Sequence, residues 1–487
     1  MSLLLSPDPR PVHFVGVAGA GMSALAELFV RRGARVTGCD AHTGGADDLR
    51  ALGVEVVEGH DAAHVVGARA VVVTSAVPKN HPELEAARIA GLPVIRRAEA
   101  LAEAVAGGLT IGIAGTHGKT TTTVLTTEAL TAAGLAPTGV VGGRVGAWGG
   151  NLKFGGTERF VVEADEYDRS FLALTPGVAV VTNVEADHLD IYADLADIVA
   201  TFTEFAGRAR FVVACADDAG ANALPYPASA EVVRYSVARA DGHRGGAEHG
   251  HPDARLVAHG VHVDVNGRTV FTVEYDGRAL GALALRVPGV HNVRNALAAV
   301  GVGLLLGTDL AAMRPGLEAF AGVERRFQRL GERMGVLVVD DYAHHPTEVE
   351  ATLAAARAAY PGRRIVAAFQ PHLFTRTRDF ADDFGRTLAA ADAVLLTEIY
   401  PAREQPLAGV TSALVADALV REGRAPAWRG GRDALATALA ERVRPGDVVL
   451  TIGAGDVTRT GPELLTLLDG RADAAPTAAA PGAGLPA

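Results

Sequence analysis

The residues with the clearest chemical potential form one loop, Gly115-Thr-His-Gly-Lys-Thr-Thr121, which directly follows the apolar segment 109–114. Glycines let backbone N–H groups approach a phosphate chain, and a helix that begins at the loop adds a favourable dipole. Lys119 supplies a mobile positive charge for the outer phosphates, and the Thr120 hydroxyl suits Mg²⁺. The loop therefore predicts phosphate binding. Gly112 lies one residue too far from Gly118 for the usual Walker A spacing, so an ordinary strand–helix turn is the competing interpretation.

Acidic residues and a histidine follow two later apolar segments. Glu163 follows residues 159–162, and the string Glu185-Ala-Asp-His188 follows residues 178–182. Parallel strands bring their carboxyl ends to one crevice, where α/β proteins bind ligands, so these groups are expected near the loop. Carboxylates beside Lys119 and Thr120 suit a Mg–nucleotide site. His188 is a softer ligand than Mg²⁺ prefers, and a direct contact with a phosphoryl oxygen is the alternative.

A second glycine-rich string, Gly16-Val-Ala-Gly-Ala-Gly-Met-Ser23, follows an apolar segment near the N-terminus. Its spacing is Gly-x-x-Gly-x-Gly rather than that of the dinucleotide motif, yet Asp40 lies where a ribose-binding acid would. The string predicts a bound nucleotide or diphosphate without deciding which one. A tight turn that binds nothing is the alternative.

Further polar clusters occur beyond residue 288. His291, Asn292 and Asn295 open a helical segment; helix capping explains Asn292 but not the whole set. Arg325-Arg326 lies at a domain junction, where an arginine could reach nucleotide phosphates, although a solvated pair is the default interpretation.

Two strand-ending strings mark the last third of the chain. Asp340-Asp-Tyr-Ala-His-His345 follows one apolar segment, and Phe369-Gln-Pro-His-Leu-Phe-Thr-Arg376 includes the end of another. An arginine near such a crevice is a natural clamp for a substrate carboxylate. Metal binding by His344-His345 is disfavoured, because adjacent histidines on a turn rarely point the same way.

The elements that must position these groups alternate between strand and helix patterns, which is typical of α/β folds with parallel sheets. We expect a Rossmann-like domain at residues 1–108, a P-loop ATPase-like α/β domain at 109–323 and a Rossmann-like α/β domain at 324–470. Asn266-Gly267 predicts a hairpin turn in the middle domain. An Ala/Pro-rich tail, 471–487, should be disordered, and residues 238–253 should form a loop.

Composition narrows the functional class. The 487 residues carry a formal net charge of −11, which argues against general nucleic-acid binding. Two cysteines cannot form a disulfide framework, and no apolar stretch reaches the roughly 18 residues of a membrane span. A cytoplasmic protein, monomeric or homodimeric, is expected.

Taken together, the strings resemble the Mur ligases of bacterial cell-wall synthesis. They cover all three expected domains, from about residue 12 to 457. The matching strings are Gly19-Ala-Gly-Met-Ser23, Gly115-Thr-His-Gly-Lys-Thr-Thr121, Glu163-Ala-Asp-Glu166, Glu185-Ala-Asp-His188, His291-Asn-Val-Arg-Asn295, Arg325-Arg-Phe-Gln328, Asp340-Asp-Tyr-Ala-His-His-Pro346 and Gln370-Pro-His372.

The resemblance implies an ATP-dependent ligase that uses Mg²⁺ and forms an amide. In that reaction the lactyl carboxylate of UDP-N-acetylmuramate attacks the γ-phosphate of ATP, and an amine then displaces phosphate from the acyl phosphate. By the resemblance, the first domain binds the UDP part, the second binds ATP and the third closes with the amino acid. His117 in the loop favours the family branch that adds L-alanine.

The resemblance also assigns roles by motif position. The implied catalytic residues are Lys119, Glu163, His188 and Arg326, and the implied Mg²⁺ ligands are Thr120, Glu163 and His188. The implied ATP-binding residues are Gly115, Thr116, His117, Gly118, Lys119, Thr120, Thr121, His291, Asn292, Asn295 and Asp341. The implied substrate-binding residues are Gly19, Gly21, Met22, Ser23, Asp40, Ser75, Tyr342, His344, His372 and Arg376.

One departure and three alternatives accompany this interpretation. Many family members carry Arg where this chain has Leu373, so the carboxylate clamp is expected to be Arg376, assisted by His372. A family branch that joins murein tripeptide to the same acceptor shares the histidine-containing loop. An NAD(P)-dependent dehydrogenase would use Asp40 but leave Lys119 unexplained. A nucleotide-gated binding protein without chemistry is the third alternative.

Overall fold

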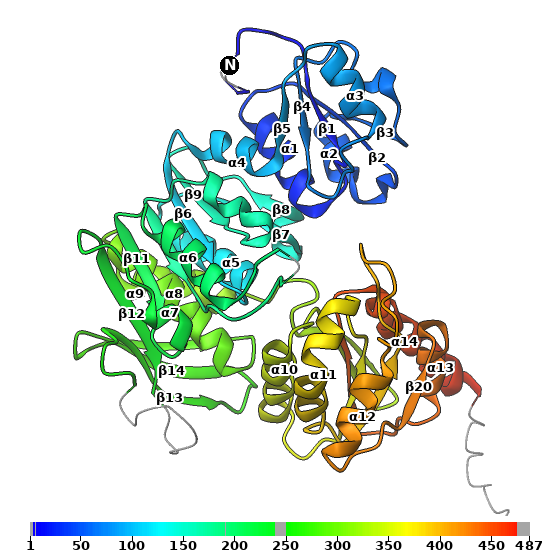
Figure 1. The fold of residues 1–487 in the computed structure, drawn as a ribbon. Coiled ribbons are helices and arrows are strands. Elements are labelled where there is room, and N and C mark those ends of the chain that lie inside the picture. Colours follow the sequence, from blue (N-terminus) through cyan, green and yellow to red (C-terminus); the bar gives the residue numbers. More distant parts are fainter. Residues whose placement is uncertain (1–2, 5, 190, 239–249, 475–487) are drawn as a thin grey trace, which may run out of the picture. The chain divides into compact units, whose positions relative to one another are not determined.

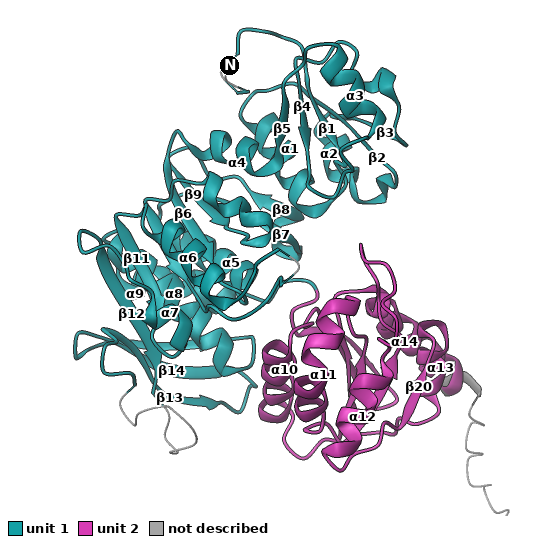
Figure 2. Ribbon diagram, viewed as in Figure 1, with its two compact units in different colours: residues 1–324 teal, residues 325–487 magenta. Residues whose placement is uncertain are grey.

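The computed structural model describes residues 3–4, 6–189, 191–238 and 250–474. The chain forms two compact units, residues 1–324 and 325–487, which Figure 2 colours separately; Figure 1 labels their helices and strands. Three sheets of five, ten and six strands, each mainly parallel and each combined with helices, confirm the predicted class of three α/β domains. Most of the tail, 475–487, and most of the predicted loop, 239–249, lie outside the described residues.

The N-terminal domain has a fully parallel sheet with the order β3-β2-β1-β4-β5. The strand order reverses direction between β1 and β4, where doubly wound sheets bind ligands. Its elements are β1 (Val12–Val15), α1 (Ala20–Arg31), β2 (Val36–Asp40), α2 (Asp47–Ala51), β3 (Glu55–Glu58), η2 (Ala62–Val65), β4 (Ala70–Val73), α3 (Pro82–Ile89), β5 (Val94–Arg96) and α4 (Arg97–Val105).

The middle domain has ten strands in the order β15-β14-β13-β12-β11-β10-β6-β9-β7-β8. The run from β13 to β7 is parallel, and antiparallel strands complete both edges. Its elements are β6 (Leu109–Ala114), α5 (Lys119–Ala132), β7 (Thr138–Val145), β8 (Gly150–Lys153), β9 (Arg159–Glu163), η4 (Tyr167–Ala173), β10 (Val178–Val181), α6 (Leu195–Ala206), β11 (Phe211–Cys215), α7 (Ala219–Ala223), β12 (Glu231–Val237), β13 (Leu256–Val263), β14 (Thr269–Tyr275), β15 (Arg278–Leu285), α8 (Val290–Leu305) and α9 (Leu310–Ala319).

Unit 2 holds six strands in the order β16-β17-β21-β18-β19-β20, with only β16 antiparallel. Helix α14 runs to Ala474. The elements are β16 (Gln328–Arg333), β17 (Val336–Asp341), α10 (Pro346–Ala359), β18 (Ile365–Phe369), α11 (Phe374–Leu388), β19 (Ala393–Thr397), α12 (Ala413–Arg421), β20 (Trp428–Gly430), α13 (Leu435–Ala440), β21 (Val448–Ile452) and α14 (Thr460–Ala474).

Three threonine hydroxyls of the segment after the loop find acceptors within their own helix. The hydroxyls of Thr123, Thr127 and Thr131 each donate to the carbonyl four residues earlier, at 2.7–2.9 Å. Such bonds satisfy the side-chain donors inside the buried helix α5, at a small cost in helix regularity. The predicted Asn-Gly hairpin is confirmed by the antiparallel pair β13 and β14.

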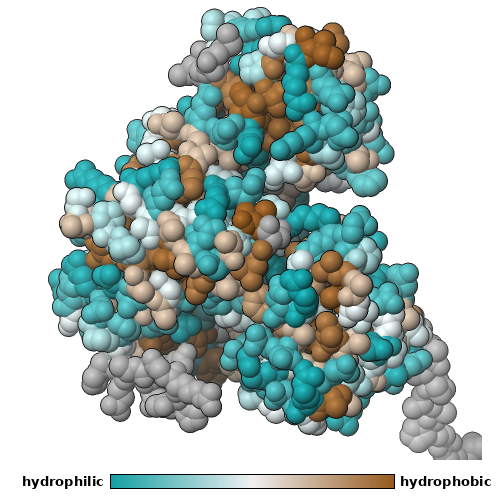
Figure 3. Space-filling view, viewed as in Figure 1, coloured by the Kyte–Doolittle hydropathy of each residue, from teal (hydrophilic) through white to brown (hydrophobic). Residues whose placement is uncertain are grey.

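The surface and the helices add one further observation. The face in Figure 3 mixes hydrophilic and hydrophobic residues. Within the described ranges, none of the helices combines the length and apolar character needed to cross a membrane.

Candidate active site

The phosphate-binding candidate is the turn between the central strand β6 and helix α5. Gly115 has φ +143° and Gly118 has φ +80°, values in the region that favours glycine. A β-carbon at Gly115 would overlap the Thr182 hydroxyl, and one at Gly118 would lie 2.7 Å from Asn295 Oδ1. Both glycines are therefore required by backbone conformation and by space.

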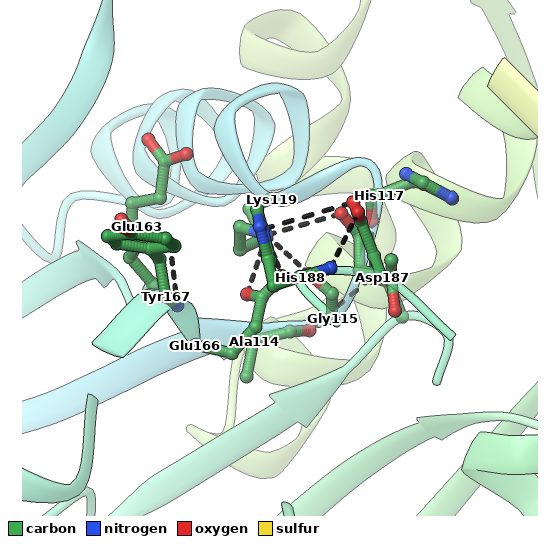
Figure 4. Close-up of polar contacts among 12 residues, drawn as sticks. Ala114, Gly115, His117, Lys119, Glu163, Glu166, Tyr167, Asp187 and His188 are labelled. Atoms are coloured by element: carbon green, nitrogen blue, oxygen red, sulfur yellow. Dashed lines mark hydrogen bonds and ion pairs between the residues drawn. The ribbon is translucent and has the colours of Figure 1, made fainter. Parts of the chain in front are cut away.

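Lys119, at the start of α5, forms an ion pair with Glu166. Its Nζ lies 2.9 and 2.7 Å from the two carboxylate oxygens and donates to the Gly115 carbonyl at 2.6 Å (Figure 4). Burial raises the pKa of Glu166 to about 7, although the Lys119 charge acts in the opposite direction. The ammonium is thus held at the loop by a buried counter-ion, a partner to which sequence reasoning gave no separate role.

Thr120 and Glu163 come together as the strand-end argument predicted. The Thr120 hydroxyl donates to Glu163 Oε1 at 2.8 Å, and the Gly142 N–H donates to Oε2 at 2.7 Å. Glu163 is at the end of β9, where Ile113 of β6 is its register partner. The hydroxyl and carboxylate oxygens are the hard donors that Mg²⁺ prefers, so this pair fits such an ion.

His188 lies in the segment that follows β10. Its Nε2 lies 3.8 Å from Glu166 Oε1 and 3.8 Å from Asp187 Oδ2, and its ring meets the edge of Tyr167. Glu166 therefore has Lys119 and His188 as neighbours (Figure 4).

The segment after β10 also fixes the loop backbone. The His117 N–H donates to Asn183 Oδ1 at 2.7 Å, and the Thr182 hydroxyl donates to the His117 carbonyl at 2.6 Å. In return the Thr116 hydroxyl accepts the Glu185 N–H at 2.9 Å. The His117 ring lies 3.7 Å from the Glu185 carboxylate. The sequence motifs assign no role to Thr182 or Asn183, although both follow β10, whose neighbour β6 leads into the loop.

Two of the predicted residues at the start of α8, Asn292 and Asn295, form hydrogen bonds within the protein. Asn295 Oδ1 accepts the Thr122 hydroxyl at 3.1 Å, and Asn292 donates to the Pro288 carbonyl at 2.7 Å; both are buried. They thus brace the loop helix and the N-terminus of α8. His291 is half-buried in the first turn of α8. Thr121 is buried in the first turn of α5.

The predicted substrate residues of the first domain surround the β1–α1 turn. Asp40, at the end of β2, accepts the Ala18 N–H at 3.0 Å and the His42 N–H at 3.1 Å, so it fastens the glycine-rich string. Ser75 is exposed beyond the end of β4. Gly19, Gly21, Met22 and Ser23 lie at the start of α1, with Met22 buried.

Unit 2 gathers four of its predicted residues. The Tyr342 and His344 rings are 5.3 Å apart, the His344 and His372 rings 5.7 Å apart, and Arg376 Nη1 lies 3.4 Å from His372 Nδ1. Arg376 is buried near the start of α11. A buried arginine among polar rings can bind a carboxylate.

Arg326 and Asp341 of the same unit have structural partners as well. Arg326 lies over the Tyr342 ring and 3.4 Å from Glu348. Asp341 accepts the N–H groups of Phe327 and Ala343, each at 2.8 Å. Burial raises the pKa of Asp341 to about 6.

Comparison with known families agrees with the three α/β domains that the structure shows. Models for the Mur ligase family catalytic domain, the Mur ligase middle domain and the Mur ligase glutamate ligase domain match residues 11–108, 113–303 and 325–455. The chain belongs to the Mur ligase family, as its strings predicted.

Individual relatives narrow the comparison. A UDP-N-acetylmuramate–L-alanine ligase of Salinibacter ruber is 44% identical, covering 94% of this chain and 95% of the relative. The enzyme of the same name from Acidothermus cellulolyticus is 47% identical, with 94% of each covered.

Solved structures of similar proteins also belong to ligases of this family. The crystal structure of a UDP-N-acetylmuramate–alanine ligase from Thermotoga maritima has a TM-score of 0.79 at 28% identity, covering 95% of this chain and 100% of that one. A murein peptide ligase from Psychrobacter arcticus has a TM-score of 0.68 at 25% identity, covering 94% and 98%.

Proposed function

We propose that this chain is an ATP-dependent ligase that joins the lactyl carboxylate of UDP-N-acetylmuramate to L-alanine in peptidoglycan precursor synthesis. The observation that carries the proposal is near-complete coverage, at 44–47% identity, by relatives named for that reaction. The loop chemistry supports it, because Lys119, Thr120 and Glu163 are arranged as phosphoryl transfer requires.

In the first step, an oxygen of the lactyl carboxylate attacks the γ-phosphorus of ATP. The bond between that phosphorus and the bridging oxygen breaks, giving an acyl phosphate and ADP. Lys119 neutralises charge on the transferred group, so its ammonium must exchange Glu166 for phosphate oxygens. The loop N–H groups at Gly115 and Gly118 orient the phosphates, while the Thr116 N–H donates to the Asn183 carbonyl.

Mg²⁺ is the implied cofactor, and Thr120 and Glu163 would hold it through their hydroxyl and carboxylate oxygens. When bound, the ion supplies positive charge to the phosphate oxygens. His188 Nε2 lies 3.8 Å from Glu166, the counter-ion of Lys119, which favours contact of His188 with a phosphoryl or acyl oxygen over direct Mg²⁺ binding.

In the second step, the amine of L-alanine attacks the acyl carbon, and the tetrahedral intermediate expels phosphate while the nitrogen loses a proton. We assign the alanine carboxylate to Arg376, with His372, His344 and Tyr342 around it. Arg326, Asp341 and His291 remain predicted nucleotide contacts, as does His117. Both oxygens of Asp341 already accept a backbone N–H, so a ribose would use their remaining lone pairs.

The UDP part is assigned to the first domain. Gly19, Gly21, Met22, Ser23 and Ser75 lie beyond the carboxyl ends of β1 and β4, where the strand order reverses. That position is the usual ligand crevice of a doubly wound sheet. Two buried free cysteines agree with a reducing compartment, and we propose a cytoplasmic location.

The test is a phosphate-release assay in which each substrate is omitted in turn. Release should require ATP, Mg²⁺, UDP-N-acetylmuramate and L-alanine together. A clear preference for murein tripeptide over L-alanine would replace the proposal with the tripeptide branch. Phosphate release that ignores both amino substrates, or an absorbance change of NAD(P)H, would overturn it.

A further inference from the structure

A second group of chemically capable side chains lies in the N-terminal domain, apart from the glycine-rich string. His13 of β1, Cys39 of β2, His64 of η2 and Glu83 of α3 each direct a donor atom to one point. The four donor atoms all lie within 4.8 Å of one another. Figure 1 shows the strands and the helix that carry them at the N-terminal end of the chain.

Sheet geometry explains why these residues meet. Successive side chains of a strand point to opposite faces. Val15 and Cys39 therefore share a buried cluster with Leu84 of α3, whereas Phe14 packs in the cluster that contains α1. His13 alternates with Phe14 in the same way and faces α3. Glu83 is 0% exposed in the first turn of α3.

The contacts around Glu83 are short and varied. Cys39 Sγ lies 3.1 Å from both carboxylate oxygens, and His64 Nδ1 lies 2.9 Å from Oε1. The Asp61 N–H donates to Oε1 at 3.1 Å. Outside this group, His60 Nδ1 lies 3.5 Å from Oε1, and the rings of His60 and His81 meet edge to face.

His13 provides an independent observation. The residue is 2% exposed, and its Nδ1 lies 3.0 Å from the Thr37 hydroxyl. Its Nε2 is buried, lies 3.9 Å from Glu83 Oε2 and has no hydrogen-bond partner among the described residues. A buried polar atom without a hydrogen-bond partner destabilises the folded protein. A ligand at the centre of the group would remove that cost.

We propose that His13, Cys39, His64 and Glu83 bind one divalent transition-metal ion of the zinc type. A thiolate, two imidazoles and a carboxylate form the four-donor set typical of tetrahedral Zn²⁺. Mg²⁺ is excluded as the favoured ion because it selects oxygen ligands. Neighbouring ligands of a tetrahedral zinc ion are roughly 3.5 Å apart, so the observed spacing needs only small side-chain shifts.

Binding of the metal ion releases one proton from the protein. The Cys39 thiol releases its proton to solvent and becomes a thiolate, while His64 carries its proton on Nε2 so that Nδ1 can bind the ion. The His64 side chain is 18% exposed and gives solvent a route to the site. The ion would join β1 and β2 to η2 and α3, so it would stabilise this domain rather than take part in phosphoryl transfer.

The experiment uses the full chain, stripped of metal, with Co²⁺ as the probe. Cobalt bound to a thiolate gives a charge-transfer absorption, and tetrahedral geometry gives strong visible bands. Wild type should bind one equivalent with both signals, and Zn²⁺ should displace it. Excess Mg²⁺ and ATP should leave the signals unchanged, which separates this site from the proposed nucleotide site.

Matched variants locate the site. Cys39→Ser should abolish the thiolate band, whereas Cys215→Ser, at the other buried free cysteine, should keep it. His64→Ala should weaken binding at least tenfold, since loss of a supporting residue alone costs 10- to 100-fold. Glu85→Gln, exposed on α3, should have no effect. A folded wild type without a thiolate band, or a band that persists in Cys39→Ser, would overturn the proposal.

Discussion

Glu83 and Glu166 are both buried, but their surroundings shift the pKa of the carboxyl group in opposite directions. Glu166 faces the Lys119 ammonium at 2.7 Å, and burial still raises its pKa to about 7. Glu83 is also desolvated, but the surrounding His13, Cys39 and His64 side chains lower its pKa to about 2. One carboxylate depends on a single mobile cation, and the other on several donors fixed by different elements.

The difference separates a site that must change partners from one that must keep them. A lysine on a flexible stem can leave Glu166 for a phosphate, and Glu166 can take up a proton near neutral pH when it does. The donors of Glu83 come from a strand, a short helix and a loop N–H, so none can leave without moving the fold. The first arrangement suits catalysis and the second suits a structural ion.

The largest effect is expected from Lys119→Met. Phosphate release should fall on the order of 10³-fold, because charge on the transferred phosphoryl group loses its nearest cation. Lys153→Met is the control. Lys153 lies on the edge strand β8 and pairs with Glu128 of α5. Steady-state phosphate release with saturating substrates measures both. More than a tenth of wild-type activity in Lys119→Met would contradict the assigned role.

The sequence predicts contacts between the ends of neighbouring strands better than contacts made by irregular segments. The loop and the Thr120–Glu163 contact follow from strand, turn and helix order and from the rule that parallel strand ends share a crevice. The specific partner of Lys119 does not follow, because Glu166 lies in the irregular segment between the end of β9 and η4. The rule for strand ends does not decide which carboxylate of that segment faces the lysine.

The Glu83 group was beyond prediction for another reason. His13, Cys39, His64 and Glu83 are spread over four elements without a spacing motif, and only the sheet order brings them together. Among strands, β16 and β15 are hard to predict from sequence, because Gln328–Arg333 is polar and the alanines and glycine of β15 resemble neither strand nor helix strongly. The boundaries of the sequence-based domains remain predictions.

The second effect is a pair of opposite pH responses in the metal-free protein. The pKa of Glu166 is raised from 4.5 to about 7, so its stabilising contribution is complete below pH 4.5 and is lost as the pH rises to 7. The pKa of Glu83 is lowered from 4.5 to about 2, so its contribution is complete above pH 4.5 and is lost as the pH falls to 2. Each change is on the order of 3 kcal/mol.

Glu166→Gln and Glu83→Gln should each remove one of these slopes. Proteolysis in urea, read on fragments of the first and middle domains, gives the free energy of unfolding at each pH. The difference in free energy of unfolding between wild type and Glu166→Gln should decrease as the pH rises from 4.5 to 7. The difference between wild type and Glu83→Gln should decrease as the pH falls from 4.5 to 2. Differences that change in the same direction would contradict the contrast between the two carboxylates.

A smaller effect is expected at the proposed Mg²⁺ ligands. Thr120→Val removes the hydroxyl that contacts Glu163, so half-saturation should require about tenfold more Mg²⁺, a change of about 1.4 kcal/mol. Thr120→Ser keeps the hydroxyl and should restore the wild-type value. Glu83→Gln should not alter the Mg²⁺ requirement. Equal Mg²⁺ curves for Thr120→Val and wild type would remove Thr120 from the proposed ion site.

The smallest effect concerns the buried guanidinium of Arg376, whose Nη1 lies 3.4 Å from His372 Nδ1. The planar guanidinium of Arg376 can bind a carboxylate through two N–H groups, whereas the Lys119 ammonium acts as a compact charge. Arg376→Lys keeps the charge but loses the planar fork, so KM for L-alanine should rise about fivefold, or about 1 kcal/mol, with little change in kcat. Arg378→Lys, exposed two residues further along α11, is the matched control. An unchanged KM in Arg376→Lys would assign the alanine carboxylate to another residue.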